Sequence, residues 1–173
     1  MAKKRDSDLG SLAIAPAHDA GAVDRYNVGL ALKRAQHELR LAINAELEPF
    51  GTNISQLNVL YMVKQYPGVS SAELARVAFL TPQTLGQQVI QMQERGLVQR
   101  SPGEGRRIRH KLTKAGEQLL VAGMEKVRAV DTKVLQDFDD RGLASLLDAF
   151  QTIERRAAEA RAHRKRFAPV AVD

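Results

Sequence analysis

The stretch SSAELARVAFLTPQTLGQQVIQMQERGLVQR, residues 70–100, predicts two short helices joined by a tight turn. Ser70 and Glu73 have the spacing of a capping box, in which each side chain accepts a hydrogen bond from the other residue's backbone N–H. Thr81 can cap the second helix, and Pro82 suits its first position because proline has no N–H to leave unpaired. Two short helices in this arrangement predict a helix-turn-helix.

A β-hairpin is predicted directly after these helices. Gly96 ends the second helix, and the spacing of the apolar residues then changes from helical to alternating. Residues 97–100 can form a strand, Pro-Gly-Glu-Gly at 102–105 a tight turn, and residues 108–112 the returning strand. Thr113 can then cap a further helix. A hairpin that follows a helix-turn-helix predicts a wing.

Long amphipathic helices are predicted on both sides of this central region. Apolar residues recur at helical spacing between Asp24 and Pro49. They recur again on both sides of a break at 139–142, and the first of these two helices is expected to continue to Phe138. The apolar stripes are wider than one small winged helix can cover, and an exposed apolar surface of that size favours a partner.

The composition fits one globular domain with added helices. The chain has 173 residues, of which 44% are hydrophobic and 27% charged, and its formal net charge is +6. It contains no Cys, which excludes disulfides and thiolate metal sites. No stretch approaches the ~20 apolar residues of a membrane span, and the basic residues near the start are not followed by the apolar run of a secretory signal. We therefore expect a cytoplasmic protein with no membrane partner.

The residue clusters that indicate an enzyme are not found in the sequence. The four His residues include no pair at the i, i+4 spacing of a helical metal site, and there is no Gly-rich phosphate loop or Ser nucleophile motif. Asp and Glu are scattered over polar faces instead of being paired in a cleft. The sequence therefore predicts no catalytic residues, no metal and no cofactor.

Positive charge is concentrated on the predicted hairpin. The segment from Arg95 to Lys114 contains seven Lys or Arg residues and one acid, Glu104. One interpretation is a solvated hairpin with a charged edge, because such charges keep edge strands from pairing with other chains. The interpretation that we favour is a wing whose arginines contact DNA phosphates and a narrow minor groove.

The second predicted helix has a polar face that carries no charge. No acid comes before Glu94, although surface helices usually mix Glu and Lys four residues apart. Gln can bond adenine at two points, and Thr can bond bases or touch a thymine methyl group, so this face suits a major groove. The alternative is an ordinary hydrophilic surface. The candidate DNA-binding residues are Ser70, Thr81, Gln83, Thr84, Gln87, Gln88, Gln91, Arg100, Arg106, Arg107 and Arg109.

Together these motifs make residues 54–116 resemble the multiple-antibiotic-resistance regulator (MarR) family of bacterial winged-helix transcription factors. The matching runs, in order, are Ser55 to Leu60, Ser70 to Ala75, Thr81 to Leu85, Glu94 to Arg100 and Leu112 to Gly116. The helices on either side match the family in length and amphipathicity. The resemblance implies a homodimer whose terminal helices interdigitate, with one winged helix-turn-helix projecting from each subunit.

The expected fold class is mainly α with a small β-hairpin wing, that is, a winged helix-turn-helix flanked by N- and C-terminal dimerisation helices. The expected segments are a flexible arm at residues 1–22, an N-terminal dimerisation helix at 23–50, a winged helix-turn-helix DNA-binding domain at 51–116, C-terminal dimerisation helices at 117–166 and a fraying tail at 167–173.

The predicted wing departs from the family pattern. The family usually carries an Asp-Arg-Arg run, where this chain has Glu104, Gly105 and Arg106, followed by Arg107. Glu in place of Asp can still form the ion pair that stiffens a wing, whereas Gly105 removes one arginine and adds flexibility. The resemblance therefore implies a minor-groove role first for Arg106 and then for Arg107.

The resemblance also implies repression that a small ligand relieves. In this family such ligands, often aromatic and anionic, bind between the dimerisation helices and the DNA-binding lobe. His37 shares a helical stripe with Tyr26, and Arg40 lies three residues further on, so an imidazole and a guanidinium could hold a carboxylate. Tyr61 could supply an aromatic wall. These four are the candidate ligand-binding residues; alternatively, His37 is a core or dimer-contact histidine bonded to a backbone carbonyl.

The sequence thus predicts a sequence-specific transcriptional regulator, a homodimeric repressor that binds double-stranded, pseudo-palindromic operator DNA and is released by a small ligand. The alternative is an architectural DNA-binding protein without an effector, which would show weak sequence preference. An interaction module that does not bind DNA is disfavoured by the cations of the wing, and no residue cluster supports an enzyme.

Overall fold

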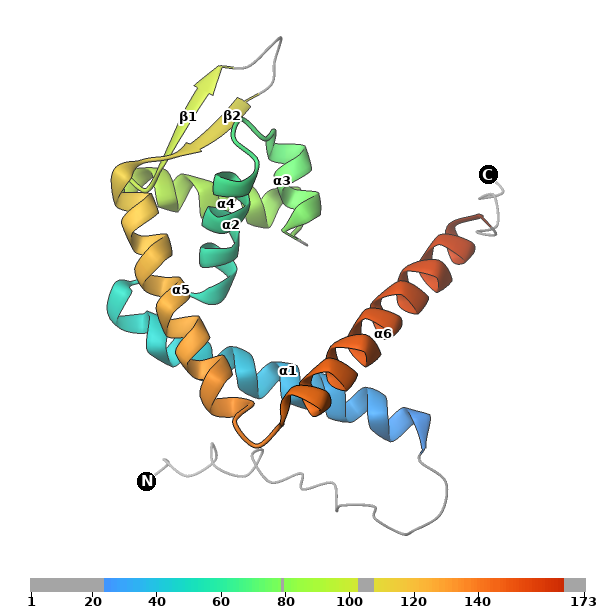
Figure 1. Cartoon of the computed structure of the whole chain (residues 1–173). Helices are drawn as coiled ribbons and strands as arrows, with labels where there is room; N and C mark the ends of the chain where they lie inside the picture. Colours follow the sequence, from blue (N-terminus) through green and yellow to red (C-terminus); the bar gives the residue numbers. More distant parts are fainter. Residues whose placement is uncertain (1–23, 79, 103–107, 167–173) are drawn as a thin grey trace, which may run out of the picture. The chain divides into compact units, whose positions relative to one another are not determined.

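The computed structural model of the chain describes residues 24–78, 80–102 and 108–166. Its α-helices and strands, labelled in Figure 1, are α1 (Arg25–Leu47), α2 (Ile54–Gln65), α3 (Ser71–Val77), α4 (Pro82–Glu94), β1 (Val98–Pro102), β2 (Ile108–Leu112), α5 (Lys114–Val134) and α6 (Asp140–Arg166). A 3-10 helix, η1 (Glu48–Phe50), follows α1. The chain separates into two units, residues 1–37 and residues 38–173, and the boundary falls within α1. The expected mainly α fold with a small hairpin is confirmed.

The starts of α3 and α4 are confirmed at the predicted capping residues. The Ser70 hydroxyl accepts a hydrogen bond from the Glu73 N–H, and the Glu73 carboxylate accepts one from the Ser70 N–H at 3.2 Å, so the capping box is complete. The Thr81 hydroxyl accepts from the Thr84 N–H at 3.1 Å, with Pro82 at the first helical position. The two helices form the predicted helix-turn-helix.

The boundary between α5 and α6 differs from the expected one. The apolar spacing predicts a helix that continues to Phe138, whereas α5 ends at Val134. The Phe138 N–H bonds the Leu135 carbonyl oxygen at 3.1 Å, which closes a turn. The Asp139 carboxylate accepts from the Gly142 N–H at 2.7 Å, in the manner of an N-cap. The residues between Val134 and Asp139 therefore form the turn that joins α5 to α6, and α5 ends before Phe138.

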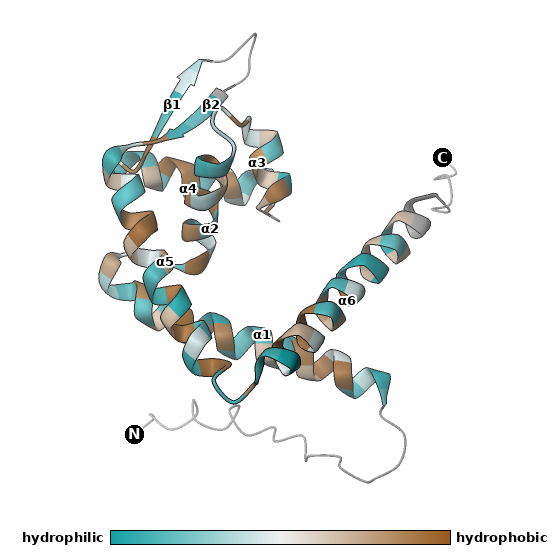
Figure 2. Ribbon diagram, viewed as in Figure 1, coloured by the Kyte–Doolittle hydropathy of each residue, from teal (hydrophilic) through white to brown (hydrophobic). Residues whose placement is uncertain are grey.

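The core of the central region lies among the end of α1, α2, α3, α4, the hairpin and α5. Leu57 of α2, Leu74 of α3 and Leu85 of α4 are fully buried there. Val89 and Met92 complete the buried stripe of α4, as the sequence predicts. Figure 2 shows apolar segments of α2, α4 and α5 in brown. The helix-turn-helix is therefore held by side chains of its own chain.

The hairpin is joined closely to the start of α5. A Cβ at Gly116 would overlap the carbonyl oxygen of Leu97, so this close approach of α5 to the chain before β1 requires glycine. The Thr113 hydroxyl accepts from the Gly116 N–H at 3.1 Å and donates to the Gly96 carbonyl oxygen at 2.6 Å. These contacts attach the start of α5 to the residues that join α4 to β1, and so they hold the base of the hairpin.

The two strands pair antiparallel, with Val98 opposite Leu112 and Pro102 opposite Ile108. Pro102, expected in the turn, is still part of β1. The rest of the predicted turn, residues 103–105, lies outside the described residues. The hairpin thus extends at least to the pair formed by Pro102.

The last helix exposes its apolar stripe. Leu147, Phe150 and Ile153 of α6 are 58%, 44% and 41% exposed. Such a stripe on one chain leaves apolar area for a partner to cover. Among the described residues, none of the helices has the length and apolar character needed to cross a membrane.

Candidate nucleic-acid interface

The side chains of Gln83 and Gln87 lie on the outer face of α4. Both are exposed, and neither forms a hydrogen bond within the described part of the chain. They are four residues apart and therefore lie on one face of the helix. The first charged residue of α4 is Glu94, at its C-terminal end. This face offers amide groups to a ligand and, before its last residue, presents no carboxylate that would repel phosphates.

The three hydroxyl residues among the candidates are engaged in capping. The Ser70 hydroxyl donates to the Glu73 carboxylate at 2.6 Å, and the hydroxyl oxygens of Thr81 and Thr84 are 2.8 Å apart. Thr81 is exposed, whereas Ser70 and Thr84 are half-buried. Thr81 remains available to a phosphate at the N-terminus of α4, where the helix dipole favours an anion.

Gln88 and Gln91 are held by α2. The Gln88 amide nitrogen donates to the Ser55 hydroxyl at 2.8 Å, and the Gln91 side-chain oxygen accepts from the Gln56 amide at 3.3 Å. The side chain of Gln88 is half-buried, and its predicted role in DNA binding stays a prediction. Each residue turns a helix by about 100°, so the position after Gln87 is rotated towards α2. Gln91 remains exposed.

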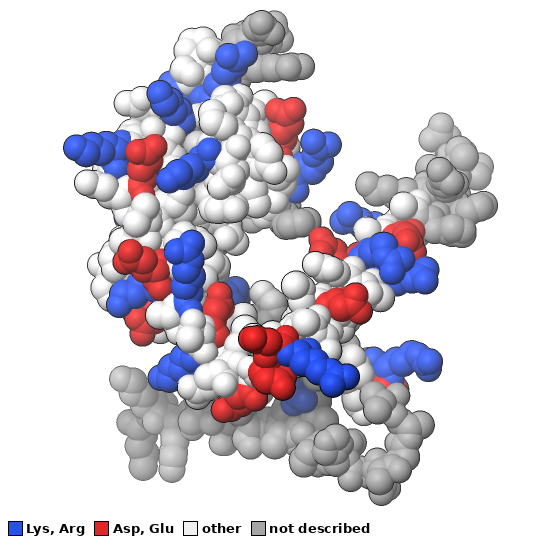
Figure 3. Space-filling view, viewed as in Figure 1, with Lys and Arg blue, Asp and Glu red and all other residues white. Residues whose placement is uncertain are grey.

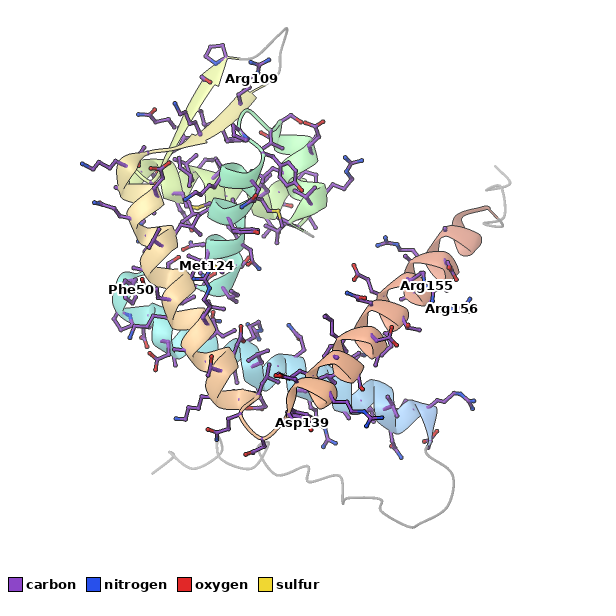
Figure 4. The ribbon with its side chains drawn as sticks, viewed as in Figure 1. Phe50, Arg109, Met124, Asp139, Arg155 and Arg156 are labelled. Atoms are coloured by element: carbon purple, nitrogen blue, oxygen red, sulfur yellow. The ribbon has the colours of Figure 1, made fainter. Side chains whose placement is uncertain are left out.

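The described arginines of the hairpin are exposed. Arg100 lies on β1 and Arg109, labelled in Figure 4, lies on β2. The Arg100 guanidinium donates to the Gln93 side-chain oxygen at 3.4 Å. Arg106 and Arg107, expected to contact the minor groove, lie outside the described residues.

The surface of the two strands is cationic. Their described residues, 98–102 and 108–112, include Arg100, Arg109 and Lys111 and no acid. Figure 3 shows blue side chains over the hairpin end of the central region. The backbones of Ser70 and Arg109 form a single antiparallel β-bridge, which places the start of α3 beside this surface. Helix-turn-helix and hairpin thus form one continuous surface that suits a polyanion.

Arg95 is one of the seven cations of the basic segment, yet it has a structural role. Its guanidinium donates to the carbonyl oxygen of Gly51 at 2.6 Å and to that of Phe50 at 3.1 Å. Phe50 is labelled in Figure 4. These bonds join the end of α4 to the end of η1. The carbonyl partners lie more than forty residues away, and no local signal in the sequence indicates them.

His110 is a buried histidine beside α3. Its ring nitrogen Nε2 lies 2.9 Å from the Ser71 hydroxyl oxygen, and Nδ1 has no hydrogen-bond partner among the described residues. Burial lowers the pKa of His110 below its usual 6.5, and the positive charge of Arg100 lowers it further. The imidazole is therefore neutral at neutral pH. The alternation of residues in β2 indicated an inward side chain here, but not its bond to Ser71.

A cavity of about 320 Å³, mostly apolar, lies between α3, α4 and the two strands. It is lined by Ser71, Ala72, Pro82, Leu85, Gly86, Val89, Ile90, Arg100 and His110. Gly86 and Ile90 are exposed residues of α4 that belong to none of the sequence motifs. In the sequence, helical spacing already places this isoleucine on the same face as two glutamines. An apolar residue on a polar face could therefore have indicated a binding surface.

The four predicted ligand-binding residues are all exposed. Tyr26 and His37 belong to the unit of residues 1–37, and Arg40 and Tyr61 to the unit of residues 38–173. Tyr26, His37 and Arg40 lie on α1, within the expected N-terminal helix, and Tyr61 lies on α2. Their joint role in a ligand site stays a prediction.

Comparison with known proteins supports the interpretation of this surface. The family model described as the MarR family matches residues 50–107. The HTH-type transcriptional repressor Rv2887 of Mycobacterium tuberculosis is 37% identical over 117 residues, which cover 66% of this chain and 84% of the repressor.

Solved structures agree with the sequence match. Rv2887 in complex with DNA has a TM-score of 0.61 and 30% identity, over 73% of this chain and 96% of that chain. Rv2887 in complex with salicylic acid has the same TM-score and identity, over 78% and 98%. CouR from Rhodococcus jostii RHA1 bound to p-coumaroyl-CoA has a TM-score of 0.66 and 25% identity, over 73% and 90%.

The matched family segment includes α2, the helix-turn-helix and β1 and ends just before β2, and the relatives are regulators of transcription with the same architecture. The chain therefore belongs to the MarR family and is a DNA-binding transcriptional regulator of the winged helix-turn-helix type.

Proposed function

We propose that this chain is a homodimeric repressor that binds a pseudo-palindromic operator through α4 and the hairpin and is released by a small anionic ligand. The observation that carries this proposal is the outer face of α4, where Gln83 and Gln87 are exposed beside the cationic strands. Uncharged amides can bond base edges in the major groove, while Arg100 and Arg109 neutralise phosphates.

A second copy of the chain is the partner that the exposed stripe of α6 suits. One chain carries one helix-turn-helix, and a repressor dimer presents two of them to one face of the duplex. We expect the half-site centres to be about one helical turn apart, ~10 bp or ~34 Å. A footprint of a single asymmetric half-site bound by a monomer would contradict this arrangement.

The effector is proposed to be a small aromatic anion, since Rv2887 binds salicylic acid, an aromatic carboxylic acid, and CouR binds p-coumaroyl-CoA, an aromatic thioester that carries phosphates. Tyr26, His37, Arg40 and Tyr61 are the proposed contacts on α1 and α2.

The cavity beside α4 is a second proposed location. Arg100 can pair with a carboxylate there, the unpartnered Nδ1 of His110 can form a hydrogen bond, and Leu85 and Val89 offer apolar contact. A ligand in this cavity would touch α4, the helix proposed to enter the major groove, directly. A His110→Leu variant would lose the response to salicylate if this location is used, whereas His37→Leu would lose it if the α1 location is used.

The experiment that tests the function is selection of duplexes from a random-sequence pool by the wild-type protein, followed by affinity measurements. A repressor should bind the selected duplex at least ~10³-fold more tightly than random DNA. Salicylate, used as the probe, should lower that affinity. An architectural protein would bind both duplexes within a few-fold and would not respond to the probe.

The remaining expectations follow from this role. The relatives are regulators, so we propose that the chain acts by binding and catalyses no reaction. A repressor works where the chromosome lies, and we propose the cytoplasm of the bacterial cell.

A further inference from the structure

Four residues of α4 form one exposed stripe. Gln83, Gly86, Gln87 and Ile90 have the spacing i, i+3, i+4 and i+7, and all four are exposed. This spacing places them in a row along one side of a helix. The recognition helix of homeodomains contacts bases through four residues at the same spacing. Gln83 and Gln87 are already proposed to bond bases, which leaves Gly86 and Ile90 without an assigned role.

The fold does not require glycine at position 86. Gly86 lies inside α4, and its φ is not in the left-handed region that favours glycine. A Cβ built there meets no atom within 4 Å. Glycine nevertheless weakens a helix relative to alanine, because it has more backbone freedom to lose. A residue that costs stability and serves no packing contact indicates a constraint from outside the chain, such as the close approach of a ligand.

The fold does not require isoleucine at position 90 either. Leu85, Val89 and Met92 of the same helix are buried, whereas Ile90 is 50% exposed. Ile90 lies about one helical turn after Gln87, which is also exposed. Arg100 of the cationic strand lines the same cavity edge as Ile90. An aliphatic group beside cations and base-bonding amides therefore meets DNA when the helix enters a groove.

We infer that Ile90 contacts the 5-methyl group of a thymine in the major groove, and that Gly86 lets α4 approach the bases closely enough for this contact. The inference rests on the proposed function, because it needs α4 in the major groove. Thymine alone among the four bases presents a methyl group there, so an exposed branched aliphatic side chain discriminates for it. Ile90 is then a specificity-determining residue beside the two glutamines.

Ile90 and Gly86 also line the cavity beside α4, so the competing explanation is that they form the rim of a small-molecule site. The two explanations differ in what the DNA must supply. A contact with thymine depends on one methyl group of the duplex, whereas a rim for a small molecule does not.

The test replaces each thymine of the selected duplex in turn by 2′-deoxyuridine, which differs only in lacking that methyl group. For the wild-type protein, deoxyuridine at one position of a half-site should weaken binding to the duplex ~4-fold, the value expected for one buried methyl group. The same substitution in both half-sites should weaken binding ~16-fold. Ile90→Ala should bind the thymine and deoxyuridine duplexes equally, and Ile90→Val should keep part of the difference. Val121→Ala, at a residue 53% exposed on α5, is the matched control and should show the wild-type difference.

A variant at Gly86 tests whether glycine is needed for the close approach of α4 to the bases. Gly86→Ala should raise the melting temperature by ~2–4 °C, because alanine favours the helix, and should weaken binding to the selected duplex by at least tenfold. Unchanged DNA affinity together with a weaker salicylate response would overturn the inference and support the cavity rim.

The outcomes also separate this inference from the proposed function. If wild-type protein selects no duplex, both fail. If it selects a duplex and binds it equally with thymine and deoxyuridine at every position, the methyl contact is refuted and the repressor proposal stands.

Discussion

Helices α4 and α6 carry apolar residues at the same helical spacing, yet only α4 buries them within its own chain. Leu85 and Met92 of α4 are at most 1% exposed, whereas Leu147 and Phe150 of α6 are 58% and 44% exposed. The difference indicates that α4 packs fully within its own chain, whereas α6 leaves an apolar stripe for a partner to cover. The polar faces differ as well: that of α4 has no acid before Glu94, whereas α6 carries ion pairs such as that of Arg156, labelled in Figure 4, with Glu159.

The largest expected effect comes from truncating the buried stripe. Leu85→Ala should lower the free energy of unfolding by about 2–5 kcal/mol, because it leaves a cavity in the core. Urea unfolding should give this decrease at every protein concentration. Leu147→Ala is the matched variant on α6, and its decrease should depend on protein concentration because the side chain is covered only in the dimer. A decrease for Leu147→Ala that is independent of concentration would contradict the comparison.

The next effect concerns dimer formation. Phe150→Asp should convert the dimer to monomers, since a carboxylate at an apolar interface stays unpaired. Affinity for the selected duplex should then fall at least ~100-fold, because the two half-sites are no longer bound by one particle. Sedimentation velocity gives the oligomeric state. Thr152→Asp, on the opposite face of α6 by helical periodicity, should remain dimeric; dissociation of both variants would show a general disruption of the helix.

Neighbouring glutamines of α4 provide a sharper contrast. Gln87→Ala should weaken binding to the selected duplex by about 1–3 kcal/mol and leave random DNA nearly unaffected. Gln88→Ala should instead lower stability by about 0.5–1.5 kcal/mol because it removes the hydrogen bond to Ser55, with specificity unchanged. Equal decreases on both duplexes for Gln87→Ala would show that α4 does not read bases.

His110 predicts a pH dependence of the central region. Burial, helped by Arg100, lowers its folded-state pKa below 6.5, so the unfolded chain takes up a proton at higher pH than the folded chain does. The stabilising contribution of neutral His110 is therefore complete above about pH 6.5 and is lost as the pH falls through the folded-state pKa. As the pH is lowered from 8 to 5, the urea concentration at the unfolding midpoint should fall more steeply for the wild type than for His110→Gln. Parallel profiles would mean that the buried imidazole is not linked to folding.

The smallest effect on stability is expected at the wing. Arg106→Ala should change the free energy of unfolding by less than ~0.5 kcal/mol. It should weaken binding to selected and random duplexes together and reduce the slope of log K against log salt by about 0.9 for each phosphate that is no longer neutralised. A salt titration on both duplexes checks this. An unchanged slope and affinity would support the solvated hairpin with a charged edge.

Local chemistry made much of the central region predictable. The helix starts at Ser70 and Thr81 depend on bonds to residues three positions away, so they can be found from short motifs. The inward stripe of α4 depends only on helical periodicity, and it places Gln83 and Gln87 on the outer face as well. The end of α5 was missed because apolar spacing continues past it, while the cap at Asp139 begins a new helix.

Contacts between distant segments were not predictable in the same way. Arg95 looks like a DNA-binding cation in the sequence, but its guanidinium bonds carbonyl oxygens of Phe50 and Gly51. Gln88 looks like its neighbour Gln87, but Ser55 of α2 holds it. Such roles depend on which segments the packing brings together, and one-dimensional spacing carries no information about that.

The sequence by itself determined the order of helices and strands, several of the residues that start them, the apolar stripe that each helix carries and the sign of the hairpin's charge, because these follow from interactions within a few residues and from composition. Only the tertiary structure decided which polar residues remain available to DNA and which are used inside the fold, and it decided that His110 is buried against Ser71. The physical reason is that a hydrogen bond or a burial across the chain depends on the three-dimensional packing of segments that lie far apart in sequence.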